Sequence, residues 1–410
     1  MKLSEDLVWR GLIKDKTFTN IKWLDKPQTF YHGIDASADS ITIGNLAAML
    51  LARRLIDAGW QAVLLAGGAT SLIGDPKETE ERELKPREEI EKNVEAVKTQ
   101  IQQLFAGKDF ISVDNYDWFK EVGYLDFLRE VGKNFAISEL MQREFITERL
   151  SSGISYAEFS YSLIQGYDYW QLYKKHETIL QIGGSDQWGN MLSGVSLIRK
   201  KEAQEVHALS MPLVVDKTTG RKFGKSETGA IWLDASKTSV YKFYQFWYNS
   251  GDEDVTDYLK VFTLLSRNEI ETLASQQKQN PADRPAQKRL AFEVTAIVHG
   301  PDQAKKQEHI AQALLAGGDV STLNEAEIAT VREELPSKKI QPGSSVMEVL
   351  VDTGLAASNS EARRLMESKS IYANNQKFNK PHLDAVDFKN NRLMLRRGKA
   401  YKDSALVELI

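Results

Sequence analysis

Short apolar runs alternate with longer segments of helical periodicity along the first 230 residues. Four of these runs have the length and composition of strands, and they lie at 29–34, 62–66, 110–113 and 178–182. Apolar residues recur at helical spacing between and after them, at 46–56, 88–105, 156–175 and 186–201. This alternation predicts an α/β fold with a doubly wound, mostly parallel sheet and helices on both faces.

The remainder of the chain divides into regions of different character. From 240 to 315 the pattern is helical throughout, and the segment 316–344 carries the Gly, Pro and Ser residues typical of linkers. Two short helices and a hairpin turned at Asn374 and Asn375 follow. We therefore expect a Rossmann-like nucleotide-binding domain at 1–230 with a helical insertion at about 115–178, a helical domain at 231–320, a linker at 321–342 and a small α+β domain at 343–410.

Composition narrows the chemistry available to the chain. Its 410 residues are 42% hydrophobic and 27% charged, as in ordinary globular proteins, and it contains no Cys. Disulfides, zinc–thiolate sites, iron–sulfur clusters and a Cys nucleophile are therefore excluded. The net charge of −4 is unevenly distributed, because residues 341–410 carry 11 basic and 8 acidic side chains. A basic end on an acidic body suits a nucleic-acid contact made by that end, although solvated basic faces are also common.

The sequence shows no targeting or membrane segment. The first residues are acidic and lack a basic region followed by an apolar core. Apolar runs such as 62–66 are too short to span a bilayer. We expect a cytoplasmic protein without a membrane partner.

Polar loops directly after the predicted strands hold the first candidate chemistry, because ligands of such sheets bind beyond the strand ends. The loop at 31–46 leads into a helix whose backbone N–H groups suit an anion, and Gly44 permits a close approach. An ordinary turn would look similar. In the loop at 67–76, Asp75 suits an ammonium or a ribose hydroxyl, although Gly-Asp-Pro also forms turns without a ligand.

Three further segments carry polar groups in suggestive patterns. Tyr161, Gln165 and Asp168 share one face of a predicted helix. Either a polar ligand or water at a partly exposed face would supply the hydrogen-bond partners of these side chains. The Gly-Gly turn at 183–190 precedes an acid and an amide, which suits a nucleotide sugar. The loop at 221–226 places two lysines on either side of a glycine. This pattern suits a mobile clamp for phosphates, although a solvated basic loop would have the same composition.

Taken in order, these segments resemble the bacterial tyrosyl-tRNA synthetases (tyrosine–tRNA ligases) of class I over essentially the whole chain. Gly-Gly-Ser-Asp-Gln-Trp-Gly-Asn at 183–190 and Lys-Phe-Gly-Lys-Ser at 222–226 are similar to the nucleotide and mobile-loop signatures of that family. Thr-Ile-Gly-Asn at 42–45 stands where class I enzymes carry His-Ile-Gly-His. The helix at 358–369 and the following hairpin are similar to the S4 RNA-binding domain that ends these proteins.

The resemblance implies a two-step reaction. Tyrosine and ATP, accompanied by Mg²⁺, form tyrosyl-adenylate and diphosphate, and the tyrosyl group then passes to the 3′ end of tRNA(Tyr). No protein-bound metal is implied, and catalysis consists of positioning and charge stabilisation. The family likeness also implies a homodimer, for which the aromatic-rich stretch 116–135 is the candidate interface, with ordinary helix packing as the alternative.

The resemblance also assigns roles to residues, with Tyr31 and Asp168 flanking the substrate phenol and Asp168 accepting its proton. The tyrosine-binding set is Tyr31, Asp35, Asp75, Tyr161, Gln165, Asp168 and Gln187. The catalytic set near the phosphates is Ser37, Thr42, Asn45, Arg82, Lys222, Lys225 and Ser226. ATP contacts are expected from Gly33, Gly44, Gly183, Asp186 and Lys225, and tRNA contacts from Arg363, Arg364, Lys369, Arg396 and Arg397.

The chain departs from the family pattern at three places. Thr42 and Asn45 replace both His of the usual motif, and His32 occupies a place where a smaller residue is often seen. Three alternatives therefore stay open: a synthetase for another aromatic amino acid such as tryptophan, a catalytically impaired synthetase-like RNA-binding protein, and a nucleotidylyltransferase that shares the catalytic fold without using tRNA.

Overall fold

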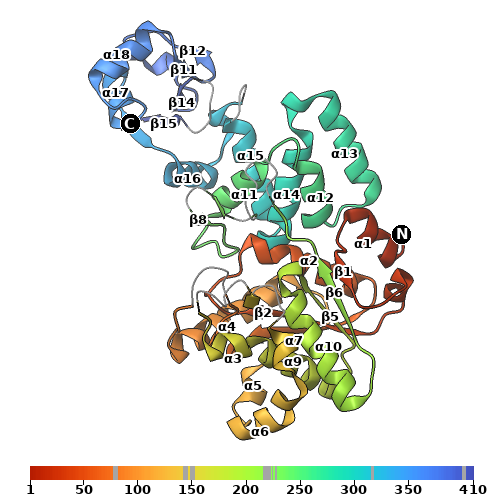
Figure 1. Cartoon of the computed structure of the whole chain (residues 1–410). Coiled ribbons are helices and arrows are strands. Elements are labelled where there is room, and N and C mark those ends of the chain that lie inside the picture. The colour runs from red at the N-terminus through yellow and green to blue at the C-terminus, as the bar shows by residue number, and fades with distance from the viewer. Residues whose placement is uncertain are drawn as a thin grey trace. The chain divides into compact units, whose positions relative to one another are not determined.

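The chain forms two compact units (Figure 1). The computed structural model describes residues 1–76, 82–141, 146–147, 153–215, 223, 225–226, 229–314, 318–398 and 403–410. The first unit comprises 1–239 and 247–290, and the second comprises 240–246 and 291–410. The predicted helical domain at 231–320 is thus divided between the two units.

The first unit is built on a six-stranded sheet in the order β1-β6-β5-β2-β3-β4. Its strands are β1 (Asp15–Lys16), β2 (Thr29–Asp35), β3 (Gln61–Gly67), β4 (Phe110–Asp114), β5 (Leu180–Gly184) and β6 (His207–Met211). All neighbouring pairs are parallel except β1 with β6. Because the chain runs outward from β2 to β4 and then returns to β5 on the other side, the strand order reverses between β2 and β5. The doubly wound α/β fold predicted from the alternation of elements is therefore confirmed.

Helices connect the strands and cover the sheet. Tyr31, Val63 and Leu65 of the sheet share one buried cluster with aromatic and aliphatic side chains of α9 and α10, and α2 and α4 also contact β3. The α-helices of this unit are α1 (Leu3–Arg10), α2 (Ile43–Asp57), α3 (Gly68–Ser71), α4 (Arg87–Leu104), α5 (Tyr116–Phe119), α6 (Tyr124–Glu130), α7 (Ile137–Leu140), α9 (Tyr156–His176), α10 (Trp188–Glu202), α12 (Val255–Phe262) and α13 (Arg267–Gln279). The short 3₁₀ helices are η1 (Ile21–Asp25), η2 (Gly132–Asn134), η3 (Ser185–Gln187) and η4 (Pro281–Asp283), and β7 (Lys225–Ser226) pairs with β8 (Gly229–Ala230).

The end of α2 and the start of α10 follow from the local conformation of the residues beside them. Helix α2 ends at Asp57, and Gly59 follows with a φ of 94°, a left-handed conformation that glycine adopts without strain. The helix predicted from residue 186 begins instead at Trp188, because Ser185–Gln187 form the tighter turn η3. That turn carries Asp186 and Gln187 to the mouth of the cavity described below.

The second unit contains a five-stranded sheet in the order β12-β11-β14-β15-β9. Its strands are β9 (Ser337–Ile340), β11 (Ile371–Ala373), β12 (Gln376–Lys377), β14 (Arg392–Arg397) and β15 (Ser404–Leu409), with a separate pair of β10 (Ser344–Ser345) and β13 (His382–Leu383). Its helices are α15 (Pro301–Leu314), η5 (Val320–Thr322), α16 (Glu325–Glu334), α17 (Val346–Asp352), α18 (Asn359–Glu367) and η6 (Ala385–Asp387), while α11 (Val240–Tyr248) and α14 (Pro285–His299) run through the boundary. The predicted hairpin is present, with Asn374 and Asn375 at positive φ between β11 and β12.

The segment 321–342, predicted as a linker, is instead part of the folded second unit. Ile328 and Val331 of α16 are buried in one cluster with Met394 and Leu406 of the sheet. Strand β9 pairs in parallel with β15 along its whole length. Within the described ranges, none of the helices combines the length and the apolar character that a bilayer span requires.

Candidate active site

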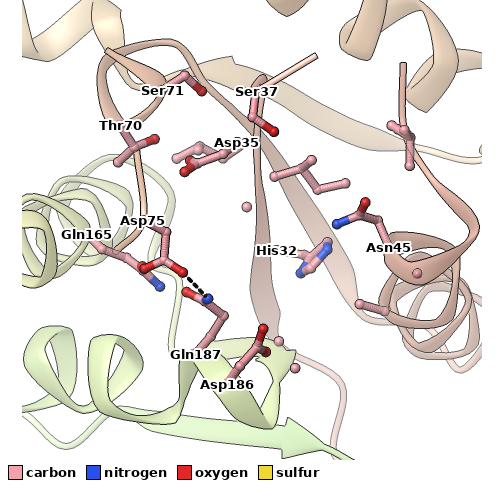
Figure 2. Close-up of a pocket in the computed structure, with 18 of the residues that line it drawn as sticks. His32, Asp35, Ser37, Asn45, Thr70, Ser71, Asp75, Gln165, Asp186 and Gln187 are labelled. Atoms are coloured by element: carbon pink, nitrogen blue, oxygen red, sulfur yellow. Dashed lines mark hydrogen bonds between the residues drawn. The ribbon is translucent and has the colours of Figure 1, made fainter. Parts of the chain in front are cut away.

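A cavity of about 540 Å³ opens in the first unit at the carboxyl ends of β2 and β5. This is the point where the strand order of the sheet reverses, which is where open α/β sheets bind ligands. Loops after β2, β3 and β5 line the cavity together with one face of α9 (Figure 2). All predicted tyrosine-binding residues lie in this lining, namely Tyr31, Asp35, Asp75, Tyr161, Gln165, Asp168 and Gln187.

Tyr31 and Asp168 are buried together at the deep end of the cavity. Each is 2% exposed. The Tyr31 hydroxyl has no hydrogen-bond partner among the described residues. Burial raises the pKa of the Tyr31 phenol well above its usual range, and the nearby Asp168 carboxylate adds to this shift. The Tyr31 hydroxyl lacks a hydrogen-bond partner and lies near an acid. This end of the cavity therefore suits a ligand that carries one hydroxyl group.

Two side chains hold the Asp168 carboxylate in place. The Trp118 indole donates to Oδ1 at 2.9 Å, and the Asn115 amide donates to Oδ2 at 3.0 Å. Burial nevertheless raises the pKa of Asp168 to about 8, because removal from water disfavours the charged form more than these two bonds favour it. Each carboxylate oxygen keeps further acceptor capacity for a ligand.

A second acidic group lies nearer the mouth of the cavity. Asp75 accepts hydrogen bonds from Gln187 at 2.9 Å and from Asn190 at 3.1 Å, and Gln165 points toward it from α9 (Figure 2). Burial raises the pKa of Asp75 to about 6, and the like charges of Asp35 and Asp186 contribute. An incoming ammonium group would favour the ionised form of this carboxyl group.

Asp35 and Tyr161 form the wall between these two ends. The Tyr161 hydroxyl donates to Asp35 Oδ2 at 2.7 Å, and Thr70 forms a second side-chain bond to Asp35. Burial raises the pKa of Asp35, although both bonds oppose the shift. A Cβ atom at Gly67 would collide with Asp35 Oδ1 and Thr70 Oγ1, so a glycine is required where β3 meets this cluster.

The start of α2 forms the opposite wall. Thr42 Oγ1 donates to Asn45 Oδ1 at 2.8 Å, and Ser37 and Gly33 are exposed to the cavity from the end of β2 and the loop that follows it. A Cβ atom on Gly44 would lie 3.6 Å from the carbonyl oxygen of Phe223, so the backbone of the basic loop comes close to this helix start at Phe223. The arrangement offers backbone donors and hydroxyl groups to an anionic ligand.

Further residues of the cavity lining come from β5 and from the loop after β3. Gly183 and Gly184 end β5, and the exposed Asp186 carboxylate lies beside them. The Arg82 guanidinium donates to the backbone carbonyl of Asp75. Among the residues that the structure describes, no group of three or more His, Asp or Glu side chains is placed to hold a metal ion.

Comparison with known proteins decides which family has this site. The family model "tRNA synthetases class I (W and Y)" matches residues 24–316, and the model "Tyrosine--tRNA ligase SYY-like C-terminal domain" matches residues 327–402. A tyrosine–tRNA ligase of Streptomyces avermitilis is 42% identical over 99% of this chain and 98% of its own. One of Desulfitobacterium hafniense is 40% identical over the full length of both chains.

The chain belongs to the tyrosine–tRNA ligases. Among solved structures, a truncated mitochondrial tyrosyl-tRNA synthetase of Aspergillus nidulans has a TM-score of 0.69 and 29% identity, covering 77% of this chain and 94% of that one. A tryptophanyl-tRNA synthetase of Encephalitozoon cuniculi has a TM-score of 0.54 at 14% identity, covering 75% of this chain and 89% of that one, which shows the shared fold alone.

Part of the basic-loop signature of the family falls outside the described residues, which include neither Lys222 nor Gly224. The backbone of Lys225 and Ser226 forms β7, paired with β8. The Phe223 ring lies in an aromatic cluster, with its centroid 4.6 Å from that of Tyr258, 5.1 Å from that of Phe262 and 5.4 Å from that of Trp247. This contact anchors the middle of the signature against α11 and α12.

The predicted tRNA-binding residues divide into two groups. Arg363, Arg364 and Lys369 are exposed on α18 and directly after it, and Arg397 is exposed but paired with Glu361 at 3.0 Å. Arg396 is buried at 6% exposure and donates to the Leu314 carbonyl. The prediction of a tRNA contact at Arg396 is therefore contradicted, because its guanidinium is used inside the second unit.

Sequence reasoning missed four residues of the site: Thr70, Asn115, Trp118 and Asn190. Asn115 had a usable signal, because it comes two residues after the predicted strand 110–113 and residues after parallel strands gather at one edge. Trp118 lies one turn further on, in α5. Asn190 stood inside a recognised motif but was not assigned a role.

Proposed function

We propose that this chain activates L-tyrosine with ATP and transfers the tyrosyl group to the 3′ end of tRNA(Tyr). The observation that carries this proposal is the buried end of the cavity, which holds both the unpartnered Tyr31 hydroxyl and the oriented Asp168 carboxylate. Phenylalanine would leave the Tyr31 hydroxyl without a partner, at a cost of about 1–3 kcal/mol, and would offer no hydroxyl group to Asp168. Tyrosine supplies the missing hydroxyl group.

The same geometry supports an order of events. With the phenol between Tyr31 and Asp168, the α-ammonium lies near Asp75 and Gln165. A tyrosine carboxylate oxygen then attacks the α-phosphorus of ATP, and the bond from that phosphorus to the diphosphate oxygen breaks. In the second step a terminal ribose hydroxyl of the tRNA attacks the tyrosyl carbonyl carbon, and AMP leaves.

The residues of this chain act by positioning rather than by acid–base chemistry. The start of α2, with Ser37, Thr42 and Asn45, and the 222–226 loop would bind the phosphates, while Gly33, Gly44, Gly183 and Asp186 would contact the nucleoside. Arg82 would approach the leaving diphosphate, as would Lys222, Lys225 and Ser226. Mg²⁺ enters with ATP and neutralises phosphate charge.

Two binding surfaces complete the proposal. The tRNA backbone would be contacted by exposed basic side chains of the 343–410 region, namely Arg363, Arg364, Lys369 and Arg397. The reaction would take place in the cytoplasm. The helical insertion exposes a set of large apolar side chains that suits a second copy of the chain, as in a homodimer. These are Tyr124, Leu125, Ile137, Met141 and Tyr156.

Exchange of radiolabelled pyrophosphate into ATP, run with each of the twenty amino acids, tests this proposal together with charging of tRNA. We expect exchange with tyrosine and charging of tRNA(Tyr). Exchange driven by tryptophan would indicate another aromatic specificity, and binding of tRNA without exchange would indicate an impaired RNA-binding protein. Exchange without charging would indicate a nucleotidylyltransferase.

A further inference from the structure

The start of α2 is joined, backbone to backbone, to the segment that follows the basic loop. The N–H of Ile43 donates to the Ile231 carbonyl at 3.1 Å, and the N–H of Leu233 donates to the Ile41 carbonyl at 2.9 Å. The segments 41–43 and 231–233 thus form a short antiparallel bridge. The position of the helix start and the position of the chain after the basic loop are therefore set together.

The side chain of Gln100, on α4, lies at this junction. Its Oε1 accepts from the Ile41 N–H at 2.7 Å, and its Nε2 donates to Ser40 Oγ at 3.0 Å. The same Ser40 oxygen accepts from the Asp234 N–H at 3.2 Å. Gln100 thus bonds directly to the chain before α2 and, through one hydroxyl group, reaches the chain after the basic loop.

Helix α4 holds the other end of the same loop through Asn93. This residue lies two helical turns before Gln100, on the same face of the helix. Its Nδ2 donates to the Ala36 carbonyl at 3.0 Å. Ser37 follows Ala36 directly, so both ends of the loop 36–42 are bonded to side chains of α4.

These two polar residues do not match an ordinary core-facing helix. The other inward positions of α4 are apolar and almost fully buried, namely Ile90, Val94, Val97 and Ile101. An amide side chain placed beside them loses its water and needs protein partners. The buried loop at Ser40 and Ile41 equally needs partners for its backbone groups. The amide groups of α4 therefore match the loop rather than the core.

We infer that Gln100 is a positioning residue for the phosphate end of the site, acting through Ser40 and Ile41. This inference rests on the proposed function, because the position of the loop affects the reaction only if ATP binds beside it. Thr42 follows Ile41 directly and carries its hydroxyl group on a shorter side chain than the usual His. A small displacement of the loop would therefore take that hydroxyl group out of reach of a phosphate.

Three variants test the inference. Gln100→Met keeps the length of the side chain but removes both hydrogen bonds, whereas Gln100→Glu keeps an oxygen that accepts from the Ile41 N–H. Gln102→Met is the matched control, because it makes the same change at an exposed position of the same helix. For each protein, kcat and KM for ATP are measured in tyrosine-dependent pyrophosphate exchange. Equilibrium dialysis gives the dissociation constant of tyrosine, and thermal unfolding checks the fold.

We expect Gln100→Met to lower kcat/KM for ATP about 10- to 100-fold, the loss expected when a binding group moves by about 1 Å. The dissociation constant of tyrosine should stay at its wild-type value, because Asn115 and Trp118, rather than α4, hold Asp168. Gln100→Glu should recover part of the loss, and Gln102→Met should behave as the wild type.

The inference is overturned if Gln100→Met keeps the wild-type kcat/KM for ATP, or if tyrosine binding weakens by the same factor as kcat/KM. If Gln100→Met does not fold, Gln100→Glu decides: a smaller loss confined to ATP supports the inference, and no loss overturns it. Failure of the proposed function would look different, because the wild type would then show no tyrosine-dependent exchange.

Discussion

Asn115 donates its side-chain amide to Asp168 Oδ2 at 3.0 Å, joining residues that are 53 positions apart in the chain. The same amide group also donates to Thr70 Oγ1, and the Asn115 oxygen accepts from the backbone N–H of Ala69. Asn115 thus links the ends of β3 and β4 to the carboxylate on α9. In the proposed function, the selectivity for tyrosine would depend on this support, because a carboxylate that turned away would no longer face the substrate phenol.

Replacement of Trp118 by Phe tests the second support of Asp168. The variant keeps an aromatic ring but removes the donor to Oδ1. Leaving the buried Oδ1 without this donor costs about 1–3 kcal/mol, so kcat/KM for tyrosine in pyrophosphate exchange should fall about 5- to 100-fold. Trp170→Phe is the matched control, because the Trp170 indole donates to Glu202 and does not line the cavity. Equal losses in both variants would mean that the effect comes from packing.

The raised pKa of Asp168 predicts a pH dependence of stability. Between the ordinary value of 3.8 and about 8, the folded protein keeps a proton on Asp168 that the unfolded chain has released. The contribution of Asp168 to the free energy of unfolding therefore falls as the pH rises through this window. Asp168→Asn lacks this titration, so its melting temperature should rise relative to that of the wild type between about pH 5 and pH 8. A constant difference across this range would contradict the raised pKa.

Several features of the molecule followed from local sequence rules. The strand and helix periods located β2, β3, β4, α2, α4 and α9 because each pattern depends on the residues of its own segment. The role of Asn115, beyond its place near the end of a predicted strand, and the role of Arg396 could not be read in that way. The first depends on α9 lying across the end of β4. The second depends on the sheet of the second unit being buried on both faces, so that Arg396 shares a face with Met394 and points inward. Likewise, the packing of α16 and the pairing of β9 with β15 rest on partners far along the chain.

The proposed dimer surface predicts a change of assembly on substitution. Leu125 and Ile137 are 71% and 70% exposed in the helical insertion. Changing both to Glu should convert a dimer to monomers in analytical ultracentrifugation, because a charge buried without a partner strongly opposes association. Val386→Glu in the second unit, where the valine is 82% exposed, should leave the sedimentation coefficient unchanged. A double variant that sediments like the wild type would place any interface elsewhere.

The exposed arginines of α18 predict a specific effect on tRNA. Changing Arg363 and Arg364 to Glu should raise KM for tRNA in charging at least about tenfold and reduce the salt slope of binding by about one for each lost phosphate contact. Pyrophosphate exchange should not change, since it requires no tRNA. A matched control changes Lys305 and Lys306 of α15 to Glu, and an equal loss there would show that only the overall charge of the unit matters.

The ratio of kcat/KM for tyrosine to that for phenylalanine, measured in pyrophosphate exchange for the wild type and for Asp168→Asn, tests the central claim most directly. We predict a strong wild-type preference for tyrosine and a decrease of about 10- to 100-fold in that ratio in the variant, mostly through loss of tyrosine activity. An unchanged ratio in Asp168→Asn would contradict the claim that this buried carboxylate recognises the substrate hydroxyl.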